Sequence, residues 1–169
     1  VYPIGINGYT PSTLTVNGTP TAWGDITVYP VNTEHPATTV KNRSLSYFWR
    51  VKSSGFTLGS ATLTHRYDYL DANVVTGAGI TEDGYVAARF NTATSTWTSG
   101  LTSDVDETNN IIGEPGSGSF LEGVAFIDGD YTAGDNNPSN PFGTPTTYYS
   151  RQTGLWNDLN SWSTTGHTG

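Results

Sequence analysis

The chain has 169 residues, with fifteen Asp and Glu against seven Lys and Arg, which gives a formal net charge of −8. An acidic surface of this kind repels polyanions, so nucleic acid is excluded as an expected partner. The chain has no cysteine, which excludes disulfides, thiolate metal sites and thiol nucleophiles. It also has no apolar run approaching the length of a membrane span.

The composition favours β-structure in a single domain. Hydrophobic residues make up only 34% of the chain while aromatic residues reach 12%, so the core must depend on a few large rings. Good surface helix formers such as Lys and Glu are scarce, which disfavours long amphipathic helices. With no methionine and a first residue Val1, we expect an internal or processed fragment of a longer chain.

The first half of the chain contains four predicted strands, at residues 9–16, 25–31, 44–52 and 61–69. The last two alternate apolar and polar side chains with a period of two, the signature of half-buried strands. We expect these two to form a hairpin through Ser53-Ser54-Gly55. Their inward residues are predicted to form the centre of the core: Leu45, Tyr47, Trp49 and Val51 from one strand and Ala61, Leu63, His65, Tyr67 and Tyr69 from the other.

Further strands are predicted at residues 84–91, 95–100, 109–113 and 119–127, separated by turn signals. This rhythm of short strands is typical of a sandwich or barrel. The sequence therefore predicts an all-β fold, an immunoglobulin-like antiparallel β-sandwich of about seven or eight strands with a loop-rich C-terminal extension. Without a disulfide between the sheets, Trp49 would anchor the core by packing alone.

From Asp128 onward the sequence is rich in turn residues, and three prolines follow closely. We therefore expect a β-sandwich module at residues 1–131 and a linker rich in Pro, Asn and Gly at residues 132–146. Residues 147–169 are predicted to begin a following module or to form a C-terminal extension. The stretch from Asp128 to Pro145 is expected to set the angle between neighbouring modules.

Several short phrases are spread along the sequence. They are Tyr2-Pro3-Ile4-Gly5, Tyr9-Thr10-Pro11-Ser12-Thr13-Leu14-Thr15, Phe48-Trp49-Arg50-Val51, Ala61-Thr62-Leu63-Thr64 with Tyr67 and Asp71, Asp130-Tyr131-Thr132-Ala133-Gly134, and Tyr148-Tyr149-Ser150-Arg151 with Trp156 and Trp162. Together they resemble a module that recurs in very large cell-surface proteins of Bacteroidetes, which are typically exported by the type IX secretion route and include gliding adhesins. The resemblance implies an extracellular, cell-surface location and a non-catalytic role as a spacer or adhesion unit. It implies neighbouring modules of the same chain as partners, and surface glycans or other cell-surface proteins as further partners.

Two acidic clusters are candidate calcium sites, because Ca²⁺ prefers carboxylate and carbonyl oxygens. Neither has the spacing of an EF-hand. The alternative is that these side chains cap turns by bonding to their own backbone. The clusters are Asp128, Asp130 and Asp135, and Asp104, Asp106 and Glu107.

Exposed aromatic side chains suggest a second kind of site. Sugars stack their apolar faces on aromatic rings, and Trp23 and Trp97 lie in turn-rich surroundings. These two residues are the predicted ligand-binding residues of an alternative function, a carbohydrate-binding module attached to a secreted hydrolase. The competing interpretation is that a core poor in aliphatic residues needs tryptophan for burial.

The sequence offers no catalytic residues. It contains no nucleophile elbow, no His-Glu-x-x-His motif and no phosphate-binding loop. His65 falls at an inward position of a predicted strand, where a hydrogen-bonded core histidine is expected. We therefore predict that the chain is not an enzyme.

Overall fold

The computed structural model describes residues 1–77, 79–113, 118–136, 140–143, 149–150 and 162–163. Within them, strands form two larger antiparallel sheets and one small pair. The first sheet has the order β1 (Ser12–Asn17), β4 (Thr62–Asp68), β8 (Ile111–Ile112), β7 (Val105–Asp106). The second has the order β2 (Asp25–Val31), β3 (Phe48–Ser54), β9 (Gly129–Asp135), β5 (Tyr85–Asn91), β6 (Thr96–Ser99). The remaining elements are the pair β10 (Tyr149–Ser150) and β11 (Trp162–Ser163) and the 3₁₀ turns η1 (Asp71–Asn73), η2 (Glu82–Gly84) and η3 (Thr102–Asp104).

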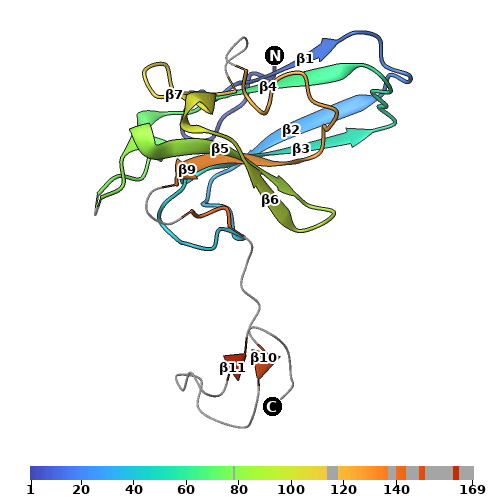
Figure 1. Cartoon of the computed structure of the whole chain (residues 1–169). Helices are drawn as coiled ribbons and strands as arrows, with labels where there is room; N and C mark the ends of the chain where they lie inside the picture. Colours follow the sequence, from blue (N-terminus) through green and yellow to red (C-terminus); the bar gives the residue numbers. More distant parts are fainter. Residues whose placement is uncertain (78, 114–117, 137–139, 144–148, 151–161, 164–169) are drawn as a thin grey trace.

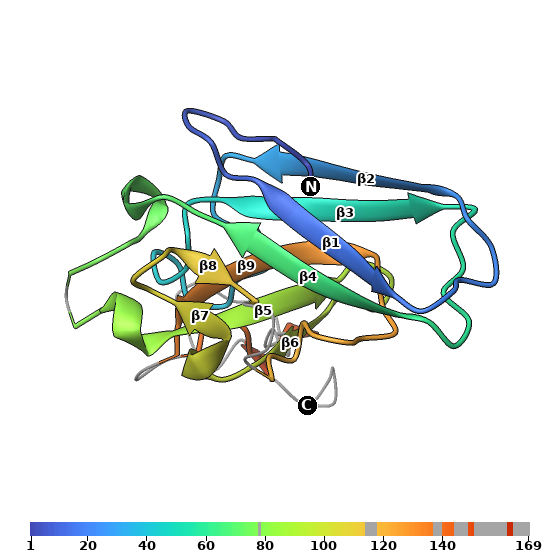
Figure 2. The same ribbon diagram turned by 90° about the horizontal axis from the view of Figure 1, so that it is seen from above.

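The two larger sheets stack face to face, so the predicted all-β antiparallel sandwich is confirmed (Figures 1 and 2). Aromatic rings fill the space between them, as the composition requires. The Trp49 ring lies 5.2 Å from that of Tyr67, which in turn lies 5.0 Å from that of Tyr131. Pro30 is tolerated in β2 because this strand is at the edge of its sheet.

The inward alternation predicted for the two central strands is confirmed. The structure buries Leu45, Tyr47, Trp49 and Val51. It also buries the inward residues predicted for the strand at 61–69, which are Ala61, Leu63, His65, Tyr67 and Tyr69. The predicted hairpin between these strands is wrong, because β3 pairs with β2 and β9 while β4 pairs with β1 and β8. The chain crosses from one sheet to the other after β3. Two strands with strongly apolar inner faces thereby cover each other across the core, which side-by-side pairing would not achieve.

Strand β9 lies at the centre of the second sheet and is buried along its whole length. The predicted boundary at residue 131 therefore falls inside a core strand, and the sandwich continues at least to Asp135. Turn-type residues are accommodated here by tertiary contacts. Gly134 lies so close to the preceding chain that an added Cβ would be 2.7 Å from the Arg43 carbonyl oxygen, and the carboxylates of Asp130 and Asp135 are paired with arginines.

Residues 119–127 do not form the predicted strand. They run beside β4 through isolated bonds, with Leu63 and Val124 exchanging two hydrogen bonds of 2.8 Å. A turn closed by Glu122 N on Ser119 O and a positive φ of 62° at Gly123 interrupt regular pairing. The segment still closes the core, because Leu121 is fully buried.

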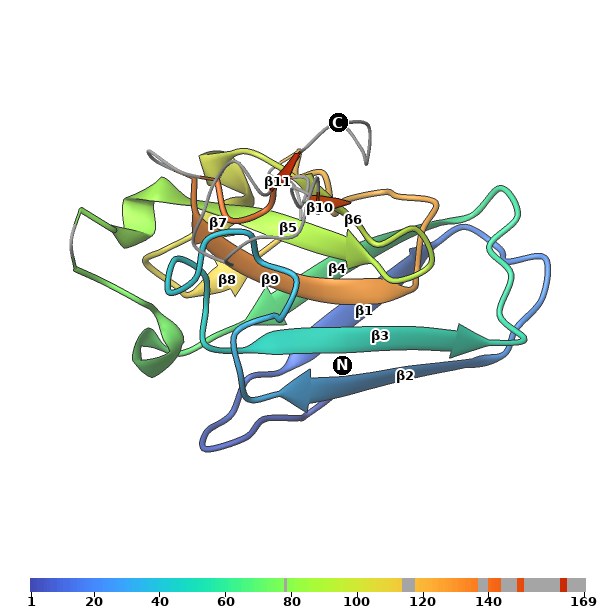
Figure 3. The ribbon, with the colours of Figure 1, turned by 90° about the horizontal axis from the view of Figure 1, so that it is seen from below.

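The outer face of the second sheet is partly covered by two segments without regular structure (Figures 1 and 3). One is the connection from β2 to β3. The other is the strap, as we name residues 140–143, whose Phe142 is buried against Val86, Ala88 and Trp97. The Thr39 N–H donates to the Pro141 carbonyl at 2.9 Å and joins the two segments. Among the described residues, no helix is long and apolar enough to cross a membrane.

Candidate functional site

A buried charge cluster lies under the β2–β3 connection. Arg50 of β3 donates two hydrogen bonds of 2.6 Å, from Nε and Nη2, to the two carboxylate oxygens of Asp130 in β9. His35 Nε2 lies 2.9 Å from Asp130 Oδ2. Asp130 is only 1% exposed, whereas 32% of the Arg50 side chain is accessible. The cluster therefore has one solvent-facing member and two buried ones.

The surroundings of His35 fix its tautomer. The Ala37 N–H points at His35 Nδ1 at 3.2 Å, so Nδ1 accepts and the proton is on Nε2, which donates to Asp130. Three rings enclose the imidazole at centroid distances of 4.7–4.8 Å, those of Phe48, Phe90 and Trp97. His35 thus pins the β2–β3 connection to the sheet.

The charge state of Asp130 follows from two opposing effects. Burial alone would raise the pKa of its carboxyl group, but the hydrogen bonds from Arg50 and His35 outweigh burial and hold the pKa below its ordinary value. Asp130 is therefore ionised at neutral pH, and its charge is compensated inside the fold.

His65 is the other buried histidine of the described chain. Tyr67 Oη lies 2.8 Å from Nδ1, and Nε2 lies 3.1 Å from the Phe126 carbonyl, to which it donates. Burial lowers the pKa of His65 to about 4. The prediction of a hydrogen-bonded core histidine at this position is confirmed.

The structure does not bring the first acidic cluster together. Asp130 and Asp135 point to opposite faces of β9, because their separation is odd in a continuous strand. Asp135 Oδ2 accepts a hydrogen bond of 2.9 Å from Arg43. Asp128, before the strand, is exposed, and its Oδ1 accepts from the Ser53 N–H at 2.7 Å and the Ser53 hydroxyl at 2.6 Å.

The second acidic cluster is partly used in turns. Asp104 is buried and its Oδ2 accepts from the Leu101 N–H at 2.7 Å, while Asp106 accepts from Thr108 and Asn109. Hydrogen bonds lower the pKa of Asp106, chiefly the one that the Asn109 side chain donates from Nδ2 to Oδ2 at 2.7 Å. Asp106 and Glu107 line an open depression of about 490 Å³ together with Asp83.

Across the described ranges, no group of three or more His, Cys, Asp or Glu side chains is placed to hold a metal ion. Calcium binding stays a prediction, and thermal melts in excess EDTA and in excess Ca²⁺ test it. If calcium binds the folded chain, the melting temperature rises with Ca²⁺. An unchanged melting temperature would contradict calcium binding.

The two predicted ligand-binding tryptophans have different surroundings. Trp97 is half-buried: its ring packs against Phe142 and its Nε1–H donates to the Ala37 carbonyl at 3.0 Å. Trp23 is 69% exposed, in the turn between β1 and β2. Its only ring contact among the described residues is an edge-to-face one with Phe56, at 5.6 Å between centroids.

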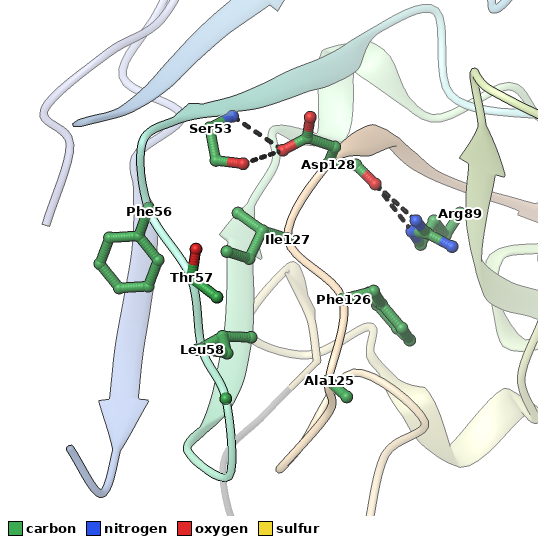
Figure 4. Close-up of a pocket in the computed structure, with 10 residues that line it drawn as sticks. Ser53, Phe56, Thr57, Leu58, Arg89, Ala125, Phe126, Ile127 and Asp128 are labelled. Carbon is green, nitrogen blue, oxygen red and sulfur yellow. Dashed lines mark hydrogen bonds between the residues drawn. The ribbon is translucent and has the colours of Figure 1, made fainter. Parts of the chain in front are cut away.

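Phe56 also lines an open depression of about 440 Å³, which we call the Asp128 depression (Figure 4). Arg89 forms part of its wall, donating from Nε and Nη2 to the Asp128 carbonyl at 3.0 and 2.6 Å. The guanidinium carbon lies 4.2 Å from the centre of the Phe126 ring. The remaining lining residues are Ser53, Thr57, Leu58, Gly59, Ala125 and Ile127.

Sequence reasoning missed the arginines and the side chains around Asp128. The sequence indicates no charge partner for Arg50, because Asp130 is 80 residues away. Only the pairing of Arg50 with Asp130 across β3 and β9 reveals the contact. Phe56 lies in the loop after β3, and Ser53 lies near the polar end of β3, so no local signal identified either residue.

We compared the chain with protein-family models, with curated proteins and with solved structures, and none of the three comparisons gave a match.

Proposed function

We propose that this chain is a non-catalytic structural module of a larger secreted cell-surface protein, acting as a spacer or adhesion unit. One observation carries the proposal: the two buried histidines of the described residues are engaged in holding the fold together. His35 and His65 are buried with both ring nitrogens hydrogen-bonded. A substrate could reach His65 only after the two sheets separated, and His35 only after the β2–β3 connection moved, which is the opposite of a preorganised active site.

The strap supports the spacer role. A module that transmits orientation along a chain needs fixed points where the chain enters and leaves. Here the chain is held after β9 by Phe142, which is buried, and by the bond from Thr39 to Pro141. These contacts define a point of exit near Gly143.

The proposed location and export route rest on the resemblance to Bacteroidetes surface modules. An acidic sandwich without cysteine is compatible with display on a cell surface, since net charge keeps such a chain soluble. The partners that the proposal names are neighbouring modules of the same chain, and surface glycans or other surface proteins.

Replacing residues 1–143 in the parent protein by an unrelated β-sandwich of equal length tests this function. A spacer predicts that surface attachment of the producing cells survives the exchange. Loss of attachment with normal export would assign the binding to this module itself. Antibody labelling of intact cells, with a cytoplasmic protein as control, measures location, and absence of labelling would refute a surface role.

A further inference from the structure

We propose that Trp23, Phe56 and the Asp128 depression form a binding site for a sugar residue of an uncharged glycan. The proposal does not depend on the spacer role, because a structural module can carry such a site or lack it. It rests on three features of the described chain: an exposed ring on a fixed backbone, an oriented carboxylate in the depression that its ring neighbour Phe56 lines, and balanced charge.

The backbone on both sides of Trp23 is fixed. Ala22 and Thr57 exchange two hydrogen bonds, of 3.1 and 2.9 Å. On the other side, Gly24 packs so closely on residues 54–56 that a Cβ at this position would overlap the Ser54 carbonyl oxygen. Trp23 is nevertheless 69% exposed. A large ring displayed on a constrained backbone loses little conformational entropy when a ligand stacks on it.

The polar side of the site is oriented as well. Asp128 Oδ1 is held by two donors from Ser53. No hydrogen bond reaches Oδ2 from the part of the chain that the structure describes, and Figure 4 shows this oxygen pointing away from Ser53. A fixed carboxylate with one free oxygen accepts hydrogen bonds from sugar hydroxyls. Thr57, an exposed residue with a hydroxyl group, lines the same depression.

The charge and size of the site favour an uncharged sugar. Asp128 and Arg89 carry opposite charges in one depression, and the net charge of −8 disfavours uronic or sulfated glycans. A pyranose ring has a C–H face that stacks on an aromatic ring and a rim of hydroxyls for the carboxylate. One exposed ring and one partly buried ring offer far less apolar area than the roughly 800 Å² per partner of a stable protein interface.

The experiment is affinity electrophoresis of the full chain in gels that each contain one neutral polysaccharide: laminarin, xylan, galactomannan, glucomannan or mixed-linkage β-glucan. At least one should retard the chain. Trp23→Ala should weaken that binding about tenfold, since stacking on one ring contributes roughly 1.4 kcal/mol. Asp128→Asn should weaken it several-fold while keeping an Oδ1 acceptor for Ser53.

Tyr9→Ala is the matched control, because Tyr9 is an aromatic residue that is 63% exposed and precedes β1, at the other end of the strand from the turn holding Trp23. It should bind like the native chain, and thermal melts establish that all three variants fold. Retardation by none of the five polysaccharides overturns the proposal. So does retardation that neither Trp23→Ala nor Asp128→Asn weakens, or that Tyr9→Ala weakens equally.

Discussion

His65 is enclosed by the rings of Tyr131 and Phe126, at centroid distances of 4.7 and 5.8 Å, and is neutral there. Its ordinary pKa of 6.5 falls to about 4 in the folded chain because burial disfavours the imidazolium. Between these two values the unfolded chain binds a proton that the folded chain does not. Stability contributed by neutral His65 is therefore full above pH 6.5 and is lost as the pH falls toward 4.

We predict that the free energy of unfolding falls by about 3 kcal/mol between pH 7 and pH 4 on account of His65, at about 1.4 kcal/mol per pKa unit. Urea denaturation at several pH values measures the slope. His65→Gln is the comparison, because its amide can donate to the Phe126 carbonyl and accept from Tyr67 without titrating. The variant should show a shallower slope, and equal slopes would contradict the assignment.

Arg50 and Asp130 form a bidentate ion pair between β3 and β9. We predict that Arg50→Ala lowers the free energy of unfolding by about 3 kcal/mol at pH 7, because among the described side chains it leaves only His35 to donate to a buried carboxylate. Chemical denaturation measures the loss. Arg66→Ala is the control, since Arg66 pairs with a partly exposed Asp68 and should cost less than about 1 kcal/mol.

The pH dependence of the stability lost in Arg50→Ala tests whether the lost ion pair is the cause. The low pKa of Asp130 in the native chain gives stability that is present above the unfolded value of about 3.9 and is lost as the pH falls below it. Without Arg50 the pKa of Asp130 should rise, so acid should lower the free energy of unfolding of the variant less than that of the native chain. The difference in free energy of unfolding between the native chain and Arg50→Ala should become smaller toward pH 3. A difference that does not change with pH would mean that lost packing, not lost charge pairing, is the cause.

At the scale of elements, β9 and the strap show how contacts distant in sequence override local signals. Glycine and aspartate in residues 128–135 are turn formers by local chemistry, yet β9 is the central strand of its sheet. Its carboxylates are compensated by Arg50 and Arg43, which come from far earlier in the chain. The strap likewise depends on Trp97 and Thr39 for its contacts.

The strap should detach on its own when its anchor is removed. We predict that Phe142→Ala increases amide exchange at Thr39, whose N–H bonds to Pro141, by about 100-fold, corresponding to about 3 kcal/mol of lost packing. The Leu45 amide, bonded to Ala133, should be unaffected. Hydrogen exchange measures both sites. The exposed Leu101→Ala serves as control, and uniform acceleration at both amides would show that the strap is not an independent unit.

These elements also mark how far the sequence could predict the fold. Alternation identified the inward residues of β3 and β4 because burial on one face leaves a period of two in the sequence. It could not assign the strands to sheets, since a hairpin and a crossover leave the same pattern. The sequence also could not predict that Trp23 is exposed and Trp97 half-buried. The strap that covers Trp97 lies 45 residues away in the chain.

At the scale of the whole molecule, the strap determines where the chain leaves the sandwich. Phe142 and the Thr39 contact hold residues 140–143 against the outer face of the second sheet. If the strap were free, residues 136–143 would add up to about 26 Å of chain at about 3.3 Å per residue. The reach and orientation of whatever follows Gly143 then depend on a single buried ring.

We therefore predict that Phe142→Ala broadens the distribution of distances in small-angle X-ray scattering of the full chain and increases its maximum dimension, by an amount bounded by about 26 Å. The physical reason is that the point of departure moves from Gly143 back to the end of β9. Leu101→Ala should scatter like the native chain, since its side chain is 72% exposed. Superimposable curves for Phe142→Ala and the native chain would mean that the strap does not fix the exit, and the orienting part of the spacer proposal would fail with it.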